Sequence, residues 1–302
     1  MSKKKSLILA IVTMLLWGSL YPVVKLGFAA YGVDTTADIL LFAGIRFVVC
    51  GIAICIFAAI KDKSSFAPVK HSIVPILLAG LFSIILHYSF SYLGLEMTDS
   101  SKTALIKQIG SLLYVCFSFL FIKEDRPTLQ KILAALVGFL GIVALNITQD
   151  GFYLSVGDLL VLASSLCTVI STVISKKVFA KVSPFTATGI FQFFGGEVLL
   201  IAGLLMGGQV NFAADASIFI MIYICAASTI SYCIWYRVVK DGEISKLFII
   251  KFAEPVFACV FGALILGENI FKIQYLVAFV LISGGIVLSN VKFKKLTRKK
   301  TP

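Results

Sequence analysis

Apolar runs of about 20 residues recur along the whole chain, and they constrain its fold more than any other feature. Backbone groups find no water inside a bilayer, so segments that cross it have to be helices. Of the 302 residues, 59% are hydrophobic and only 14% are charged, whereas soluble domains average about a quarter charged residues. We therefore expect an all-α membrane protein with ten transmembrane helices, near residues 7–29, 36–60, 72–95, 102–122, 129–147, 157–175, 184–206, 217–237, 245–266 and 273–291.

Basic residues fall on alternate connections between these runs. The N-terminus, every second connection and the C-terminal tail together hold 20 Lys and Arg, whereas the other connections hold only Lys102 and Lys272. Basic loops stay on the cytoplasmic side of a membrane. This bias predicts a multi-pass protein of the cell (cytoplasmic) membrane with both termini inside. It also accounts for the net charge of +12 without a nucleic-acid partner.

The second half of the chain repeats the first at a fixed offset of 144 residues. Residues 92–146 match residues 236–290 at 14 of 55 positions without a gap. Shared apolar composition does not explain the polar matches, which are Lys102/Lys246, Lys107/Lys251, Glu124/Glu268, Gln130/Gln274 and Asn146/Asn290. A unit with an odd number of spans enters the membrane from the opposite side in its second copy. We expect two inverted five-helix repeats, residues 1–149 and 150–291, followed by a basic cytoplasmic tail at 292–302.

Together these features resemble the EamA family of the drug/metabolite transporter superfamily, whose members have ten spans in two repeats. The residues that carry the resemblance are Trp17-Gly18-Ser19, Arg46-Phe47, Tyr92 with Ser100-Ser101, Glu254-Pro255, Glu124, Glu268, and the glycines Gly138, Gly141, Gly284 and Gly285. The resemblance covers essentially the whole chain and implies a small-metabolite permease, often an exporter, without fixing the substrate. Family members more often have small or apolar residues where this chain has Lys107 and Lys251, so these lysines are candidates for its own specificity.

Several charged residues fall well inside the predicted spans. A charge near the bilayer centre costs about 2.5–3.5 kcal/mol, so each one needs a partner or a water-filled cavity. Glu254 lies three residues after Lys251 on the same helix face, Glu197 lies at nearly the same depth as Lys107, and Arg46 lies near the midplane. The lysines and glutamates either form structural ion pairs, or they line a central cavity where the lysines bind a carboxylate or phosphate. In the second case Glu197 or Glu254 could also carry a coupling proton.

Two prolines interrupt spans at membrane depth. Pro22 removes the helical donor for the Gly18 carbonyl, and Pro255 removes the donor for the Lys251 carbonyl. Irregular backbone is tolerated there only where it faces protein or water, so we expect both prolines at the central cavity, in a gating role. The four glycines of the resemblance are expected to allow close helix packing. Aromatic residues gather near the same positions, and those expected to line a substrate cavity are Trp17, Tyr21, Tyr88 and Trp235, with His87, Tyr92 and Tyr232 nearby.

Other classes of function find little support. The sequence contains no H-E-x-x-H, G-x-S-x-G or G-x-x-x-x-G-K-[ST] motif. Its seven cysteines show no metal-type spacing with the two histidines. We therefore expect neither an enzyme nor a primary pump, and no catalytic residue, metal or cofactor.

Two substrate classes stay open. Lysines in a cavity favour a secondary active transporter that moves a small carboxylate-bearing metabolite, such as an amino acid or organic acid, by alternating access; the resemblance favours export. An aromatic-lined cavity would instead suit a quaternary amine or another organic cation, as a multidrug transporter binds. Protons are a candidate coupling ion, membrane lipids surround the protein, and both a monomer and a homodimer are compatible with the sequence.

Overall fold

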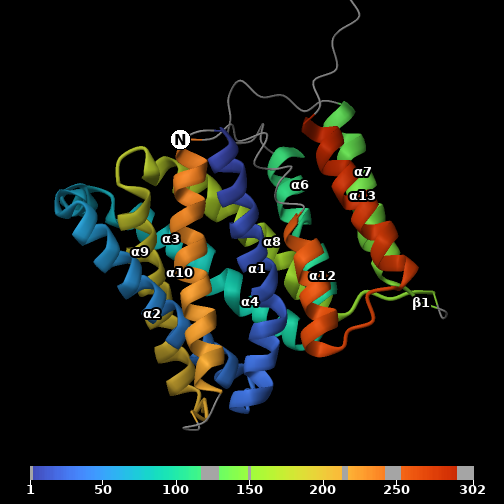
Figure 1. Ribbon diagram of the computed structural model, residues 1–302, viewed down its shortest axis with the longest axis horizontal. Helices are drawn as coiled ribbons and strands as arrows, with labels where there is room; N and C mark the ends of the chain where they lie inside the picture. Colours follow the sequence, from blue (N-terminus) through green and yellow to red (C-terminus); the bar gives the residue numbers. More distant parts are fainter. Residues whose placement is uncertain (1–2, 117–128, 149–150, 213–216, 242–252, 291–302) are drawn as a thin grey trace, which may run out of the picture.

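The computed structural model describes residues 3–116, 129–148, 151–212, 217–241 and 253–290, and these fold almost wholly into helices (Figure 1). The helices are α1 (Lys3–Tyr31), α2 (Thr36–Lys61), the 3₁₀ helix η1 (Lys63–His71), α3 (Ile73–Gly80), the π-helical turn η2 (Leu81–Ile85), α4 (Leu86–Glu96), α5 (Ser100–Lys107), α6 (Ile109–Cys116), α7 (Leu129–Leu145), α8 (Val156–Phe179), α9 (Pro184–Leu205), α10 (Ile218–Asp241), α12 (Ala253–Leu266) and α13 (Ile273–Asn290). Two strands of two residues, β1 (Ile147–Thr148) and β2 (Gly151–Phe152), form an antiparallel hairpin between α7 and α8.

Helices occupy the places of the predicted spans. Among the described residues, six helical segments are long and apolar enough to cross a membrane: Leu7–Tyr31, Thr36–Lys61, Ile73–Glu96, Val156–Phe179, Pro184–Leu205 and Ile218–Trp235. Shorter apolar helices, Ile132–Leu145, Ala253–Leu266 and Ile273–Gly285, lie where three further spans are predicted. The predicted span at 102–122 differs, because α5 and α6 are separate helices that meet at Gln108. Residues 117–122 and 245–252 of the predicted spans lie outside the described residues.

The helices pack in neighbouring pairs across the bundle. In Figure 1, α2 and α9 lie side by side at one edge, α7 and α13 at the other, and α1, α4, α8, α10 and α12 lie between them. Within this central group α1 packs against α10 and α12, and α4 packs against α8. The largest buried cluster includes Phe28, Phe42 and Phe47, so it joins the edge pair to the central helices.

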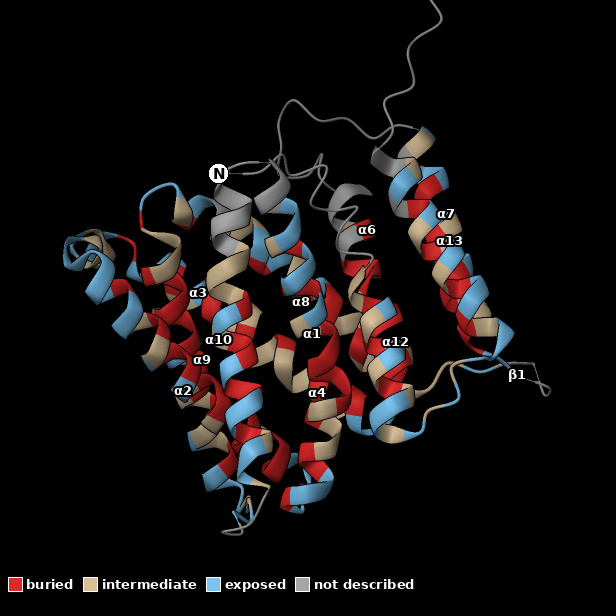
Figure 2. Ribbon diagram, in the orientation of Figure 1, coloured by how far each residue is buried: buried red, intermediate tan, exposed pale blue. Residues whose placement is uncertain are grey.

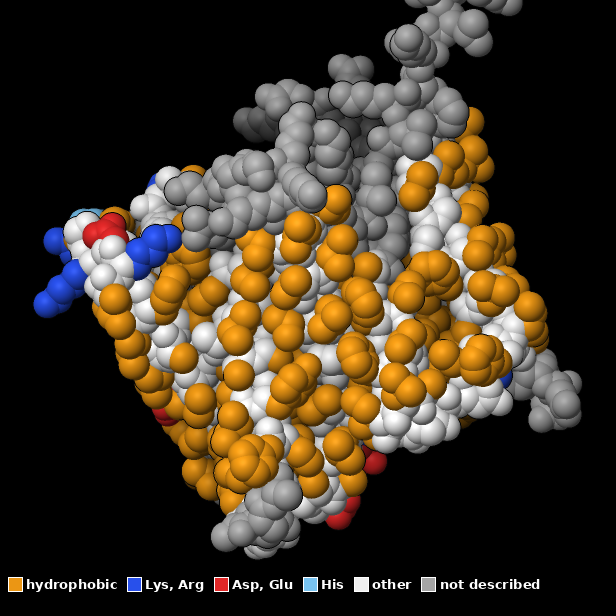
Figure 3. All heavy atoms as spheres, viewed as in Figure 1, with side chains coloured by type: hydrophobic (Ala, Val, Ile, Leu, Met, Phe, Trp, Pro, Cys, Tyr) orange, Lys and Arg blue, Asp and Glu red, His pale blue; other side chains and the backbone are white. Residues whose placement is uncertain are grey.

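Apolar side chains cover the outside of the bundle as well as its core. Exposed examples are Ile52 and Ile56 on α2 and Leu136 and Phe139 on α7, and Figure 2 shows such exposed positions alternating with buried ones along each helix. Figure 3 shows hydrophobic side chains spread over the face of the molecule, whereas Lys and Arg gather at one corner. Soluble monomers rarely expose an apolar patch of this extent. The surface therefore suits contact with lipid tails, as expected for a multi-pass membrane protein.

Glycines bring the backbones of α2 and α9 into direct contact. A Cβ built on Gly51 would lie 2.3 Å from the Phe193 nitrogen, and one built on Gly196 would lie 2.5 Å from the Val48 nitrogen. The same relation recurs along both helices, for Gly44 against Leu200, Gly189 against Cys55 and Gly203 against Leu41. In these contacts the residue numbers rise along α2 as they fall along α9, so the two helices are antiparallel. Small residues at such an interface let membrane helices approach closely without any hydrophobic driving force between them.

The glycines expected to allow close packing do so at three of four positions. A Cβ on Gly141 would lie 2.5 Å from the Ile282 side chain, and one on Gly285 would lie 2.7 Å from the Ala134 carbonyl oxygen, so both mediate contact between α7 and α13. Gly138 packs against Leu112 of α6. The expectation for Gly284 is wrong, because a Cβ there would meet nothing within 4 Å.

We predict that Gly51→Ala lowers the stability of the folded protein, whereas Gly284→Ala does not. The added methyl group at residue 51 meets the backbone of Phe193, which cannot turn away as a side chain would, and overpacking of this kind costs roughly 1–3 kcal/mol. At residue 284 the methyl group enters open space, and Ala exceeds Gly in helix propensity by up to about 1 kcal/mol. The melting temperatures of the two purified variants measure the difference. Equal melting of Gly51→Ala and the wild type would contradict backbone contact between α2 and α9.

Candidate functional site

Two helix interruptions lie next in sequence to two residues that contact each other, His87 and Lys107. The π-helical turn η2 lies directly before α4, which opens with Leu86 and His87. The second interruption, at Gln108, ends α5 directly after Lys107. π-turns inside membrane helices occur frequently at functional sites. The residues Leu81–Ile85 contain neither glycine nor proline, although Gly80 directly precedes them.

Lys107 places its ammonium among polar and aromatic groups. Its Nζ atom donates a hydrogen bond to His87 Nε2 at 3.1 Å and another to Ser91 Oγ at 3.3 Å. The rings of Tyr21 and Tyr88 lie 5.5 Å and 5.7 Å from the same atom. Aromatic faces attract a cation at such distances. Because Lys107 is also in the last turn of α5, the negative end of the helix dipole stabilises its charge.

His87 links this lysine to α8. Its Nδ1 atom lies 2.9 Å from the carbonyl oxygen of Ser164 and 2.9 Å from Thr168 Oγ1. A carbonyl oxygen can only accept a hydrogen bond, so we assign the ring proton to Nδ1. Nε2 then has a lone pair and accepts from Lys107. His87 is thus a buried neutral imidazole in this arrangement.

Arg46 is a second cation in the interior, with only 2% of its surface exposed. Its Nε and Nη2 atoms donate to Ser228 Oγ on α10, at 3.1 Å and 2.7 Å. The guanidinium carbon lies 4.8 Å from the Phe47 ring centre, 5.4 Å from that of Tyr88 and 5.7 Å from that of Tyr92. Among the described residues no carboxylate forms an ion pair with Arg46. A hydroxyl group and aromatic rings thus lie around this charge.

Tyr88 connects the two cations. Both Lys107 and Arg46 lie within 6 Å of its ring centre, at 5.7 Å and 5.4 Å. Its hydroxyl oxygen lies 3.1 Å from that of Tyr232 on α10. One aromatic ring thus has two positive charges beside it.

A carboxylate lies beside the same region. The Tyr21 hydroxyl donates to Glu254 Oε1 at 2.9 Å, while the Tyr21 ring faces Lys107. Close packing fixes this contact, since a Cβ on Gly18 of α1 would lie 2.7 Å from the Glu254 carbonyl oxygen of α12. Trp17, four residues before Tyr21, packs against Trp235 with ring centres 5.2 Å apart.

The structure brings together most of the residues that the sequence singles out. Lys107, Tyr21, Tyr88, Arg46 and Glu254 form one connected group, and Trp17 and Trp235 adjoin it through Tyr232. Pro22 lies inside α1, buried beside Tyr21, and Pro255 lies buried in the first turn of α12. Lys251 lies outside the described residues, so its role stays a prediction.

Glu197 lies elsewhere in the bundle. It is half-buried on α9, which packs mainly along α2, whereas α5 with Lys107 packs against α12, α8 and α1. The predicted pair of Lys107 and Glu197 stays a prediction. Sequence reasoning placed His87 near the cavity without assigning it to Lys107, and the polar partners that it missed are Ser91, Ser164, Thr168 and Ser228. Their only signal was a polar side chain within an apolar run, and such residues are common in membrane helices.

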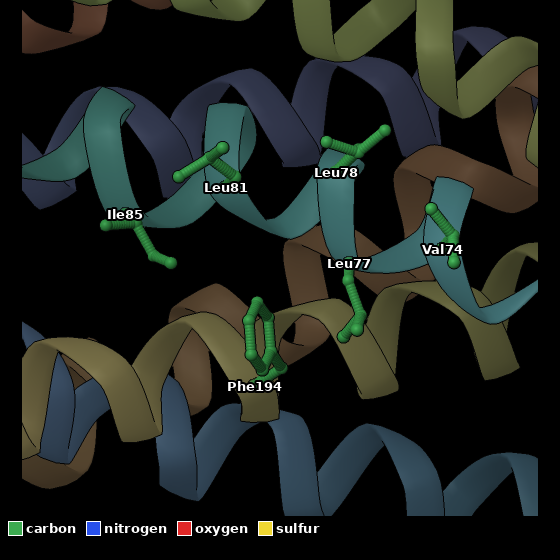
Figure 4. Close-up of a pocket in the computed structure, with 6 residues that line it drawn as sticks. All are labelled: Val74, Leu77, Leu78, Leu81, Ile85 and Phe194. Carbon is green, nitrogen blue, oxygen red and sulfur yellow. The ribbon is translucent and has the colours of Figure 1, made fainter.

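A separate cavity of about 240 Å³ lies between α9 and the helices α3 and η2 (Figure 4). All six side chains that line it are apolar: Val74, Leu77, Leu78, Leu81, Ile85 and Phe194. Because it offers no hydrogen bond or charge, it suits a lipid tail and not a charged solute.

A carboxylate from the second half of the chain caps the N-terminus of α5. The Glu268 carboxylate accepts hydrogen bonds from Ser100 N at 2.7 Å, Ser101 N at 3.0 Å and Ser101 Oγ at 2.5 Å. The residue before the helix, Asp99, does not cap it but accepts from the Tyr275 hydroxyl at 2.9 Å. Anions are stabilised at helix N-termini by free N–H groups and the helix dipole. The N-terminus of the helix that ends in Lys107 is thus capped by Glu268, a residue from the second half of the chain.

Charges enclosed among membrane helices mark the pathways of ions and solutes, so the fold and the site together define a membrane transport protein. The profile of the EamA-like transporter family matches the chain twice, over residues 4–147 and 155–291. The chain belongs to the EamA-like transporter family, and it is a transporter, not an enzyme.

Its relatives carry transporter names as well. "Uncharacterized transporter YvbV" of Bacillus subtilis is 25% identical over 298 residues, which cover 97% of this chain and 93% of that protein. "Uncharacterized inner membrane transporter YedA" of Escherichia coli K12 is 22% identical over 285 residues, which cover 92% and 89%. A solved crystal structure matches 95% of this chain and 96% of its own with a TM-score of 0.68 and 19% identity, so it shares the fold.

We predict that Glu268→Gln lowers the melting temperature. The amide can accept hydrogen bonds through one oxygen only and has lost the charge that the helix N-terminus favours, a loss of about 1–3 kcal/mol. A matched control is Glu96→Gln, an exposed residue at the end of α4. There a negative charge faces the unfavourable end of the helix dipole, so its removal should leave the melting temperature unchanged or slightly higher. The cap would have no stabilising role if both variants melted like the wild type.

Proposed function

We propose that the protein is a secondary active transporter for a small carboxylate-bearing metabolite, such as an amino acid or organic acid, and that it works by alternating access. The observation that carries this proposal is the position of Tyr88 between the cations Lys107 and Arg46. A charge in the membrane interior is retained against its cost where it serves a solute pathway. Two cations beside one ring favour the binding of an anion between the helices that carry them.

The described partners of these cations support an exchangeable site. Lys107 donates to His87 and Ser91, and Arg46 donates to Ser228, all of which are neutral groups. A carboxylate forms stronger, charge-assisted hydrogen bonds than a hydroxyl or an imidazole does. An incoming carboxylate can therefore replace these partners with a gain in free energy, and its departure restores them.

An amino acid fits this region at both ends. Its carboxylate would face Lys107 and Arg46, while its ammonium would face Glu254 and the neighbouring aromatic rings. Tyr21 links the two ends, because its ring faces Lys107 and its hydroxyl donates to Glu254. An organic cation in the cluster of Trp17, Tyr232 and Trp235 is the second candidate, favoured by the ring contacts of 5.8 Å and 5.2 Å. The two nearby cations would repel it.

For the whole chain we propose ten spans in two inverted repeats, 1–149 and 150–291, with both termini cytoplasmic in the cell membrane. The helix packing supports this arrangement. The second predicted span packs on the seventh (α2 on α9), and the fifth packs on the tenth (α7 on α13). The first packs on the eighth (α1 on α10) as the third does on the sixth (α4 on α8). A two-fold axis in the membrane plane would produce this pattern. Export is the direction that family resemblance favours.

We predict that a carboxylate stabilises the wild type but not Lys107→Ala. Purified protein is heated with L-serine, L-glutamate, L-malate, glycerol 3-phosphate or choline. A compound that binds only the folded state at one hundred times its Kd adds about 2.7 kcal/mol to the free energy of unfolding. Lys25→Ala is the control, since Lys25 donates to the Thr98 carbonyl at 2.5 Å and takes no part in the site; it should respond like the wild type.

Choline raising the melting temperature of all three proteins equally would contradict the proposal and support the cation alternative. Stabilisation of Lys107→Ala by the same carboxylate to the same extent would contradict the role of this lysine. A response to glycerol 3-phosphate alone would move the substrate class from carboxylates to phosphate esters.

A further inference from the structure

Only one proton can lie between Lys107 Nζ and His87 Nε2. It is bonded either to the ammonium nitrogen or to the imidazole nitrogen. The Ser164 carbonyl keeps one ring proton on Nδ1, so Nε2 faces the Lys107 ammonium with a lone pair, at 3.1 Å. An imidazolium would turn an N–H donor toward an N–H donor and bring two positive charges to the same distance. The ring can therefore be protonated on Nε2 only if the ammonium moves away.

The positive charges around His87 also favour a neutral imidazole ring. Lys107 comes from α5, and the neutral Ser164 and Thr168 of α8 contact the ring at Nδ1. On its own helix, Tyr88 packs against His87 at 4.6 Å, and Arg46 of α2 lies beside that ring. The carboxylate of Glu254, on α12, hydrogen-bonds Tyr21 of α1, whose ring faces Lys107. An anion that enters beside Lys107 and Arg46 would thus change the balance of charge at His87 most directly.

We propose that His87 is the proton-binding residue of the transport cycle and that Lys107 controls its protonation. This inference rests on the proposed function, because the substrate anion is what draws the ammonium from His87. A lysine ammonium stands on a flexible four-carbon stem and can turn toward a new acceptor. Once the ammonium has left, Nε2 takes a proton from water on the open side of the membrane. The Nδ1–H group keeps its hydrogen bond to the Ser164 carbonyl oxygen.

The cycle then couples anion and proton. When the anion leaves on the other side, the ammonium returns to Nε2, and the proton on that nitrogen departs to water. Anion and proton therefore bind and leave together, and each raises the affinity of the other by the same factor. For a substrate with one negative charge, the net charge moved is zero, so the membrane potential does not drive transport.

The state of His87 can be observed without any substrate. The chain has two histidines, and His71 is exposed on η1, so His71→Gln leaves His87 as the single imidazole. Nitrogen NMR of histidine-labelled protein in nanodiscs separates a neutral ring from an imidazolium, between about pH 5 and 8, where histidine ordinarily titrates. We expect a neutral ring with its proton on Nδ1, and a larger imidazolium fraction at each pH after Lys107→Met. Lys25→Met is the matched control and should leave the spectrum unchanged.

Identical His87 spectra with and without Lys107 would overturn the proposal, and so would an imidazolium in the parent protein. Proton uptake supplies a second test that does not depend on the folding of Lys107→Met. L-glutamate and L-malate are added to weakly buffered wild type and to His87→Gln, whose amide oxygen still offers Lys107 an acceptor. We expect one proton taken up per anion bound by the wild type, and none by the variant.

Anion binding with no proton uptake, or with equal uptake by both proteins, would overturn the role of His87 while leaving the proposed function intact. Absence of any anion binding would instead contradict the proposed function. The NMR titration would then still decide, by itself, whether Lys107 controls the protonation of His87.

Discussion

A positive charge inside a membrane has to be surrounded by dipoles, and the centre of this molecule is built around that requirement. The ammonium of Lys107 lies at the carboxyl end of the short helix α5, whose dipole favours it. The break at Gln108 creates that helix end, and the π-turn η2 precedes the helix that presents His87 and Ser91. Irregular backbone and buried charge therefore occur together in the central helices.

The positions of the membrane helices could be predicted from the sequence because hydropathy is a local property of the chain. The predicted span at 36–60 corresponds to Thr36–Lys61, and the one at 184–206 corresponds to Pro184–Leu205. Part of the site could be predicted for a related reason. A charged residue in an apolar run is expensive wherever it lies, so Lys107, Arg46 and Glu254 stand out without any knowledge of their neighbours.

The partners of those charges could not be predicted in the same way. Depth along a span follows from residue number, but the direction in which a side chain points depends on how each helix is rotated in the bundle. The hydrogen bond between Lys107 and His87, twenty residues earlier in the chain, does not follow from the depth of either residue. The break at Gln108 is equally hidden, because neither Gln108 nor its immediate neighbours in the chain are proline or glycine. Tertiary packing decides both features.

The glycine contacts between α2 and α9 have a mechanical consequence. Gly44 and Gly51 on α2 alternate along the interface with Gly189, Gly196 and Gly203 on α9. Each glycine lies against the backbone of the other helix. A shift of one residue along the axis would drive side chains into these backbones, so the two helices cannot slide past each other. They have to move as one rigid body. The interrupted helices differ from this pair: at η2 and Gln108 the regular α-helical hydrogen-bond pattern is already interrupted, directly beside the two residues of the proposed proton exchange.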